Sequence, residues 1–141
     1  METRRIPAED VARVADFRAA LRQFLRRSER IARESGLTPQ RHLLLLMIKG
    51  ASDGSEQSTV TELADRLQLA QSTVTELVRR AETAGLVERT RSSADGRVAY
   101  LRLTDEGEGR LARSFTSHAA EREQLRAAFQ QLEESLPDHS G

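Results

Sequence analysis

Apolar residues recur at three- and four-residue steps along residues 9–35, which predicts one long amphipathic helix. Its apolar positions are Val14, Phe17, Leu21, Phe24, Leu25, Ile31 and Ala32. Arginines occupy the other side, at Arg18, Arg22, Arg26, Arg30 and Arg33. Gly36 is expected to end the helix, because glycine adopts the left-handed conformation that closes helices.

A second helix is predicted to begin directly afterwards. Thr38 is a good N-terminal cap, and Pro39 occupies the first helical position, where its missing N–H costs nothing. The run Leu43–Ile48 is apolar nearly all round, so we expect this helix to be central and buried. Residues 49–58 contain two glycines and three serines and are expected to form an exposed loop.

Two short helices separated by a tight turn are predicted over residues 59–84. Thr59 and Glu62 have the spacing of a capping box that opens the first helix, which ends near Leu67. Gln71 opens the second helix, and Gly85 ends it. This spacing is typical of a helix-turn-helix.

The periodicity then becomes strand-like. Leu86–Arg91 and Val98–Leu103 are two short runs separated by a segment that ends in the turn-forming pair Asp95-Gly96. A hairpin directly after a helix-turn-helix makes a winged helix. Thr104 is expected to cap a final helical region.

The last apolar stripe has alternating four- and three-residue steps, which is a heptad-like pattern. Its members are Leu111, Phe115, His118, Arg122, Leu125, Phe129, Leu132 and Leu136. Either one helix runs through this region, or two helices meet near residues 114–119. The first and last helical regions carry more apolar surface than one small domain covers, so we expect them to mediate dimerisation.

The predicted fold is therefore mainly α with a small β-hairpin wing. One domain spans residues 1–141. The winged-helix DNA-binding region covers residues 38–104, flanked by dimerisation helices at 9–35 and 105–136.

Composition excludes several classes of function. The chain of 141 residues has 22 basic and 22 acidic residues, which argues against a histone-like binder but not against a local basic patch. It has no cysteine, so disulfides, thiolate metal sites and cysteine nucleophiles are excluded. The three histidines lack metal-ligand spacing. No nucleophile–base pair or phosphate loop is found, so we expect neither an enzyme nor a cofactor.

Cellular location follows from similar arguments. No apolar run approaches the roughly 20 residues of a membrane span, and no secretory leader opens the chain. A cytoplasmic protein without membrane contact is expected.

The second helix of the pair carries the candidate DNA contacts. Four apolar residues form its inward face, and a separate polar face carries Gln71, Ser72, Thr75 and Arg79. Short polar side chains at a helix N-terminus, followed by arginine, suit the major groove. The alternative is an ordinary solvated face.

The predicted hairpin adds basic charge. Residues 79–102 hold six arginines and three acidic residues, a net charge of +3 within a neutral chain, and the arginines include Arg80 and Arg91. Arg97 lies at the predicted tip, where it could enter a minor groove, and Asp95 could fix its rotamer. The alternative is an ordinary tight turn whose ion pair has no role in DNA binding.

These segments together resemble the MarR family of winged-helix transcriptional regulators. The matching pieces, in order, are Gly36-Leu37-Thr38-Pro39-Gln40, Thr61-Glu62-Leu63-Ala64, Gln71-Ser72-Thr73-Val74, Gly85-Leu86-Val87-Glu88-Arg89, Asp95-Gly96-Arg97 and Leu103-Thr104-Asp105-Glu106-Gly107. The resemblance covers residues from about 10 to 136. The family's recognition-helix positions match Gln71, Ser72, Thr73, Thr75 and Arg79, and its wing residues match Asp95 and Arg97. Glu76 and Glu82 depart from a basic helix and would repel phosphates if turned toward DNA.

The resemblance implies a homodimer that binds double-stranded DNA at a palindromic operator, most simply as a repressor. Many family members are released by small aromatic acids or by cysteine oxidation, and the second route is closed here. A small aromatic or anionic effector is then expected, with His42, His118 and Arg122 as candidate pocket residues. Each could instead be an ordinary, partly buried side chain. A winged helix serving only as a protein-interaction module is the main alternative, against which the arginines weigh.

Overall fold

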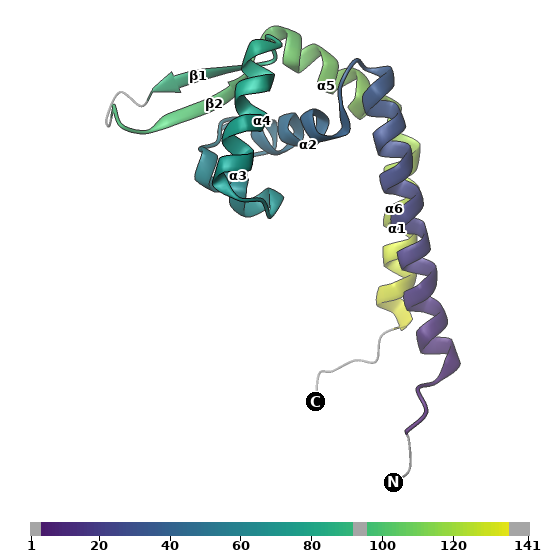
Figure 1. Ribbon diagram of the computed structural model, residues 1–141. Coiled ribbons are helices and arrows are strands. Elements are labelled where there is room, and N and C mark those ends of the chain that lie inside the picture. Colours follow the sequence, from purple (N-terminus) through teal and green to yellow (C-terminus); the bar gives the residue numbers. More distant parts are fainter. Residues whose placement is uncertain (1–3, 92–95, 136–141) are drawn as a thin grey trace.

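The computed structural model describes residues 4–91 and 96–135, and within them the chain forms six helices and one hairpin (Figure 1). In chain order the elements are α1 (Ala8–Glu34), α2 (Pro39–Lys49), α3 (Val60–Leu67), α4 (Gln71–Thr83), β1 (Val87–Arg91), β2 (Ala99–Leu103), α5 (Asp105–Ser117) and α6 (Ala119–Ser135). The fold is mainly α with a β-hairpin, which confirms the predicted class.

Threonine side chains cap helices where the sequence predicts caps. Thr38 and Thr59 accept hydrogen bonds from the backbone N–H groups of Arg41 and Glu62, each at 3.1 Å, and Thr104 caps α5 in the same way. Each cap satisfies a donor that the helix itself leaves unpaired, which stabilises a helix by about 1 kcal/mol. These local bonds fix where α2, α3 and α5 begin.

The hydrophobic core lies between α2, α3, α4 and the base of the hairpin. Its most deeply buried side chains are Ala32, Leu44, Leu45, Ile48, Leu63, Val74, Val78, Ala81, Leu86 and Leu101. Helix α1 contributes buried residues only at Ile31 and Ala32, near its C-terminal end. The winged helix therefore has a core of its own, and most of α1 lies outside that core.

Helix α2 lies in the core as predicted, but one of its sides is not buried. Leu44, Leu45 and Ile48 are fully buried, but Leu43 is 42% exposed and Met47 is half-buried. Leu43 lines a cavity that is described below. A wholly apolar run gives no sign that one of its faces borders a cavity.

The hairpin pairs β1 and β2 antiparallel, with Val87 opposite Leu103 at its base. Ser58 bridges to the other side of β2: its N–H donates to the Leu101 carbonyl oxygen at 3.1 Å, and the Leu101 N–H donates to the Ser58 carbonyl oxygen at 2.8 Å. Ser58 is buried. The exposed loop predicted for residues 49–58 is thus one residue shorter at each end, because Lys49 is the last residue of α2 and Ser58 joins the sheet.

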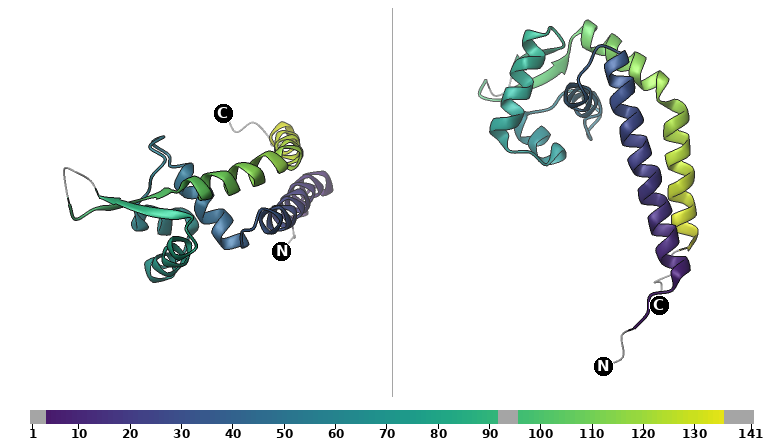
Figure 2. Two further views of the ribbon diagram at one scale, coloured as in Figure 1. Left: turned by 90° about the horizontal axis from the view of Figure 1, so that it is seen from above. Right: turned by 45° about the vertical axis from the view of Figure 1, so that its right-hand side comes forward.

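The two ends of the described chain form a helical arm. Helix α6 folds back alongside α1 of the same chain, in opposite directions (Figures 1 and 2), and the rings of Phe17 and Phe129 meet edge to face at 5.9 Å. Helices α5 and α6 meet at His118, so the second of the two sequence alternatives is correct. Within residues 4–91 and 96–135, no helix combines the length and apolar character that a membrane crossing requires.

The start of α5 packs directly against the turn before β1. The Thr104 hydroxyl donates to the Gly85 carbonyl oxygen at 2.6 Å, and Gly107 is buried against Leu86. A Cβ added at Gly107 would lie 2.2 Å from the Leu86 carbonyl oxygen. Only glycine permits this approach, so Gly107 sets the angle at which α5 leaves the winged helix.

Substituting alanine at Gly107 is expected to destabilise the protein by about 1–3 kcal/mol, because the backbone of Leu86 must move. Gly109→Ala is the matched control in the same helix, since no atom lies within 4 Å of the added Cβ. There alanine should stabilise by up to about 1 kcal/mol through helix propensity. Urea unfolding measures both variants, and equal effects would contradict the assigned role of Gly107.

Candidate nucleic-acid interface

Helix α4 presents a polar face opposite the core. Its buried residues are Val74, Leu77, Val78 and Ala81. The predicted contacts on this helix are all exposed: Gln71, Ser72, Thr73, Thr75, Arg79 and Arg80. Gln71 also donates to the Thr61 hydroxyl of α3 at 3.4 Å. The structure thus gathers these candidates on the outward side of the second helix of the helix-turn-helix.

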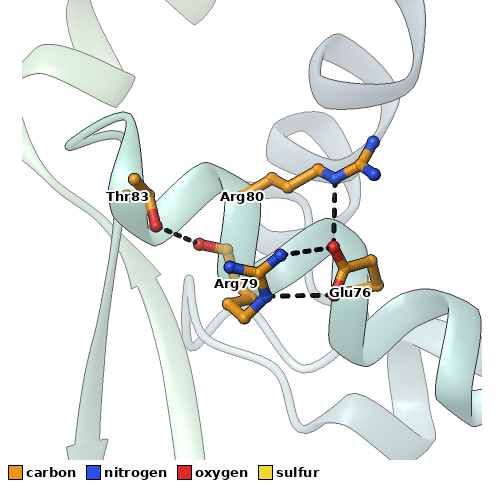
Figure 3. Close-up of polar contacts among 4 residues, drawn as sticks. All are labelled: Glu76, Arg79, Arg80 and Thr83. Atoms are coloured by element: carbon orange, nitrogen blue, oxygen red, sulfur yellow. Dashed lines mark hydrogen bonds and ion pairs between the residues drawn. The ribbon is translucent and has the colours of Figure 1, made fainter.

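Glu76 lies in the middle of this outward side and binds two arginines (Figure 3). Arg79 Nε donates to Glu76 Oε2 at 3.0 Å while its Nη2 donates to Oε1, and Arg80 Nε donates to Oε1 at 3.1 Å. The hydrogen bond from Arg79, together with Arg80, lowers the pKa of Glu76 to about 2. Thr83 donates only to the backbone oxygen of Arg79 (Figure 3). The three- and four-residue spacing was the sequence signal for this cluster.

The hairpin projects from the winged helix on the side away from the arm (Figure 1). Arg91 and Arg97 are both exposed, and Arg91 Nη1 donates to the Gly96 carbonyl oxygen at 3.3 Å. Asp95 lies outside the described residues, so its expected bond to Arg97 stays a prediction.

The second acidic residue of α4 serves a different contact. Glu82 Oε1 accepts from Arg89 Nε at 2.9 Å, which ties α4 to β1. Glu82 therefore points to the hairpin, not to the centre of the outward face. Sequence reasoning counted Arg89 only as charge and missed this link.

A cavity of about 350 Å³ lies where α1, α2 and the α5–α6 junction meet. It brings together all three predicted pocket residues, His42, His118 and Arg122. Its other lining residues are Phe24, Leu25, Ser28, Glu29, Pro39, Gln40, Leu43, Leu46 and Phe115. The aromatic walls were missed because their sequence positions are indistinguishable from core positions.

The two cavity histidines are held among aromatic rings. The His118 ring stacks on Phe24 at 4.7 Å and meets His42 edge to face at 6.5 Å. Burial lowers the pKa of both, and a charge on His118 lowers that of His42 further. The neutral form of both imidazoles is therefore favoured. His118 Nε2 is buried without a hydrogen-bond partner among the described residues.

Arg122 supplies the positive charge of the cavity wall. Its guanidinium lies 3.7 Å above the Phe115 ring and donates to the Phe115 carbonyl oxygen at 2.7 Å. Among the described residues, Glu29 is the one acidic residue that lines the cavity. Of the three predicted pocket residues, Arg122 is therefore the one that provides a positive charge for an anionic ligand.

Residues 35–98 match the sequence model of the MarR family, and the match runs from the end of α1 into the hairpin. Over these residues the chain is similar to the MarR family, which confirms the resemblance found in its sequence. Members of the MarR family are DNA-binding transcriptional regulators and not enzymes, which confirms both sequence-based predictions. No curated protein sequence matches the chain.

Solved structures share the MarR winged-helix fold. AbsC, a MarR family transcriptional regulator from Streptomyces coelicolor, is 20% identical with a TM-score of 0.66, covering 96% of this chain and 86% of its own. The transcriptional regulator Tm0710 from Thermotoga maritima is 27% identical with a TM-score of 0.62, covering 78% and 75%. A single-residue mutant of S. aureus MepR, bound to an oligodeoxyribonucleotide, is 23% identical with a TM-score of 0.62, covering 86% and 82%.

Proposed function

We propose that this protein is a homodimeric repressor of the MarR type that binds a palindromic operator and releases it when a small organic ligand fills the cavity. The polar face of α4, turned away from the core beside a basic hairpin, carries the proposal. The oligonucleotide-bound MepR structure supports DNA as the partner of this fold.

In this proposal each candidate residue has a stated role. The short side chains of α4 approach base edges and nearby phosphates, and arginines reach guanine or the backbone. The first group is Gln71, Ser72, Thr73 and Thr75, and the second is Arg79, Arg80 and Arg91. Arg97, oriented by Asp95, enters the minor groove, where the negative potential favours a guanidinium.

Exposed apolar side chains support the dimer. Outside the DNA-facing surface, those between 45% and 72% exposed include Ile6, Val11, Val14, Leu25, Phe115 and Phe129. They lie on or beside the α1–α6 arm and the cavity. A second arm would remove them from water, and the two-fold axis of such a dimer would present two winged helices to two half-sites.

Alanine at Arg97 is expected to weaken operator binding by about 1–3 kcal/mol per half-site and to reduce the salt slope by about one. Arg113→Ala removes an exposed arginine of α5, outside the proposed contacts, and serves as the matched control. Titrations use an operator selected from random DNA, at two salt concentrations. Binding by Arg97→Ala equal to that of the wild type at both would exclude the hairpin from the interface. Ser72→Ala and Thr75→Ala should alter sequence preference more than affinity.

The dimer is tested by sedimentation. The wild type is expected to sediment as a dimer at micromolar concentration, and Val14→Asp should shift it toward monomer by charging the apolar surface. Ala12→Asp places the same charge on the same helix at an exposed position outside the apolar stripe, and should remain dimeric. A well-folded wild-type monomer would contradict the proposal.

The cavity supports a small organic effector. Its volume of about 350 Å³ and its aromatic walls suit one ring system, and Arg122 suits a carboxylate. His118 Nε2 is a buried polar atom that such a ligand could satisfy. Without cysteine, thiol oxidation cannot be the switch.

Aromatic carboxylates are expected to raise the melting temperature and lower operator affinity, whereas the corresponding neutral amides should do so less. Arg122→Gln should remove the preference for the carboxylate. Arg126→Gln is the control, because Arg126 lies on the same helix but is paired with Glu123. Peroxide should leave DNA binding intact. The proposal of a small organic effector would be contradicted by either of two results. One is a rapid loss of DNA binding on oxidation that a reductant reverses, and the other is no response to any aromatic acid tested.

A further inference from the structure

We propose that Glu76 restrains Arg79 and Arg80 in the free protein and thereby lowers the affinity of α4 for DNA of arbitrary sequence. The inference rests on the proposed function in that it takes α4 as the helix that faces DNA. It makes Glu76 a specificity-determining residue, although a carboxylate on such a helix would by itself only repel phosphates.

The position of Glu76 is the first reason. At 100° per residue, Glu76 lies nearly opposite Val74 and Ala81, so it occupies the centre of the outward face. Arg79 lies on this face and Arg80 beside it (Figure 3). A carboxylate at this position lies close to any DNA that α4 faces, and it can form ion pairs with both arginines.

The geometry of the contacts is the second reason. Arg79 uses Nε and Nη2 on the two oxygens of Glu76, so one of the two edges with which a guanidinium grips a phosphate or guanine is already occupied. Arg80 donates a hydrogen bond from its Nε to the same carboxylate. The three side chains together carry one positive charge instead of the two that the arginines would present alone.

The exposure of the cluster makes the restraint reversible. Side-chain exposure is 64% for Arg79, 60% for Arg80 and 45% for Glu76. Ion pairs so exposed are weak, so a bidentate partner such as the O6/N7 edge of guanine can displace the carboxylate. A phosphate contacted without a base provides a less specific partner for the guanidinium, and it must also approach the negative charge of Glu76. The cluster therefore penalises contacts to backbone alone more than contacts to a matching base.

The restraint does not depend on pH in the physiological range. The arginines hold the pKa of Glu76 near 2, so its carboxylate stays charged. This separates the cluster from a protonation switch.

The test compares Glu76→Gln with Glu82→Gln. Both remove one negative charge from α4, but Glu82 pairs with Arg89 across to β1 and not with the outward arginines. On a duplex of random sequence, Glu76→Gln should bind about three- to tenfold more tightly than the wild type, with a salt slope steeper by about one, because one more phosphate is neutralised. Glu82→Gln should change binding by less than about twofold. On the selected operator Glu76→Gln should gain less, so its specificity ratio falls.

A double-mutant cycle shows whether Glu76 acts through the arginines. In an Arg79→Ala/Arg80→Ala background, Glu76→Gln should increase affinity for random DNA by less than about twofold, because only the direct repulsion of phosphates by the carboxylate is then removed. Circular dichroism checks that each variant is folded. Three results would overturn the inference: no gain for Glu76→Gln, an equal gain for Glu82→Gln, or loss of operator binding by Glu76→Gln without a gain on random DNA. Failure to select any operator with the wild type would defeat the proposed function instead, and the random-duplex comparison would still decide the role of Glu76.

Discussion

Burial of one face of α4 fixes what the winged helix can present to a partner. Val74, Val78 and Ala81 are completely buried and Leu77 nearly so. Burying a side chain of the size of valine or leucine stabilises a fold by about 1.5–3 kcal/mol, whereas exposed ion pairs such as those on the opposite face contribute little to stability. The apolar face therefore sets the rotation of the helix about its axis. That rotation in turn determines where the polar side chains of α4 lie on the surface.

The same reasoning explains which parts of the fold could be predicted from sequence. Caps such as Thr38 and Thr59 act over three residues, so their signals are local and the helix starts were correct. The face of α4 followed from periodicity alone. By contrast, the pairing of Ser58 with Leu101 and the exposed side of Leu43 depend on distant segments. No local pattern encodes them, because an apolar or small side chain looks the same whether it meets core, sheet edge or cavity.

The candidate DNA-binding site was likewise predicted from sequence only in part. Residue types on the outward face of α4 were predicted, but not that Glu76 holds two of the arginines. The signal was present as three- and four-residue spacing and was interpreted as repulsion, because net charge was considered without pairing. Similar pairs join Arg110 to Glu106 and Arg126 to Glu123. A chain with equal numbers of acids and bases thus keeps many arginines partly neutralised. The affinity of the chain for phosphates depends on how many of these arginines a partner can release from their carboxylates. The total number of arginines is therefore an overestimate of the number available to bind phosphate.

The cavity has a mechanical consequence, because its walls come from different parts of the chain. Phe24 belongs to the arm, His42 to the winged helix, and His118 to the junction between α5 and α6. The stacking of the Phe24 ring on the His118 ring links the arm to that junction. A ligand among these groups can change the relation between arm and winged helix only if it binds one arrangement more tightly than another. Because the neutral form of both imidazoles is favoured, the attraction for an anion comes from Arg122, which already lies over the Phe115 ring. The difference must come from moving Arg122 off Phe115 or from satisfying His118 Nε2, and both are events at the junction that carries α6 back to α1.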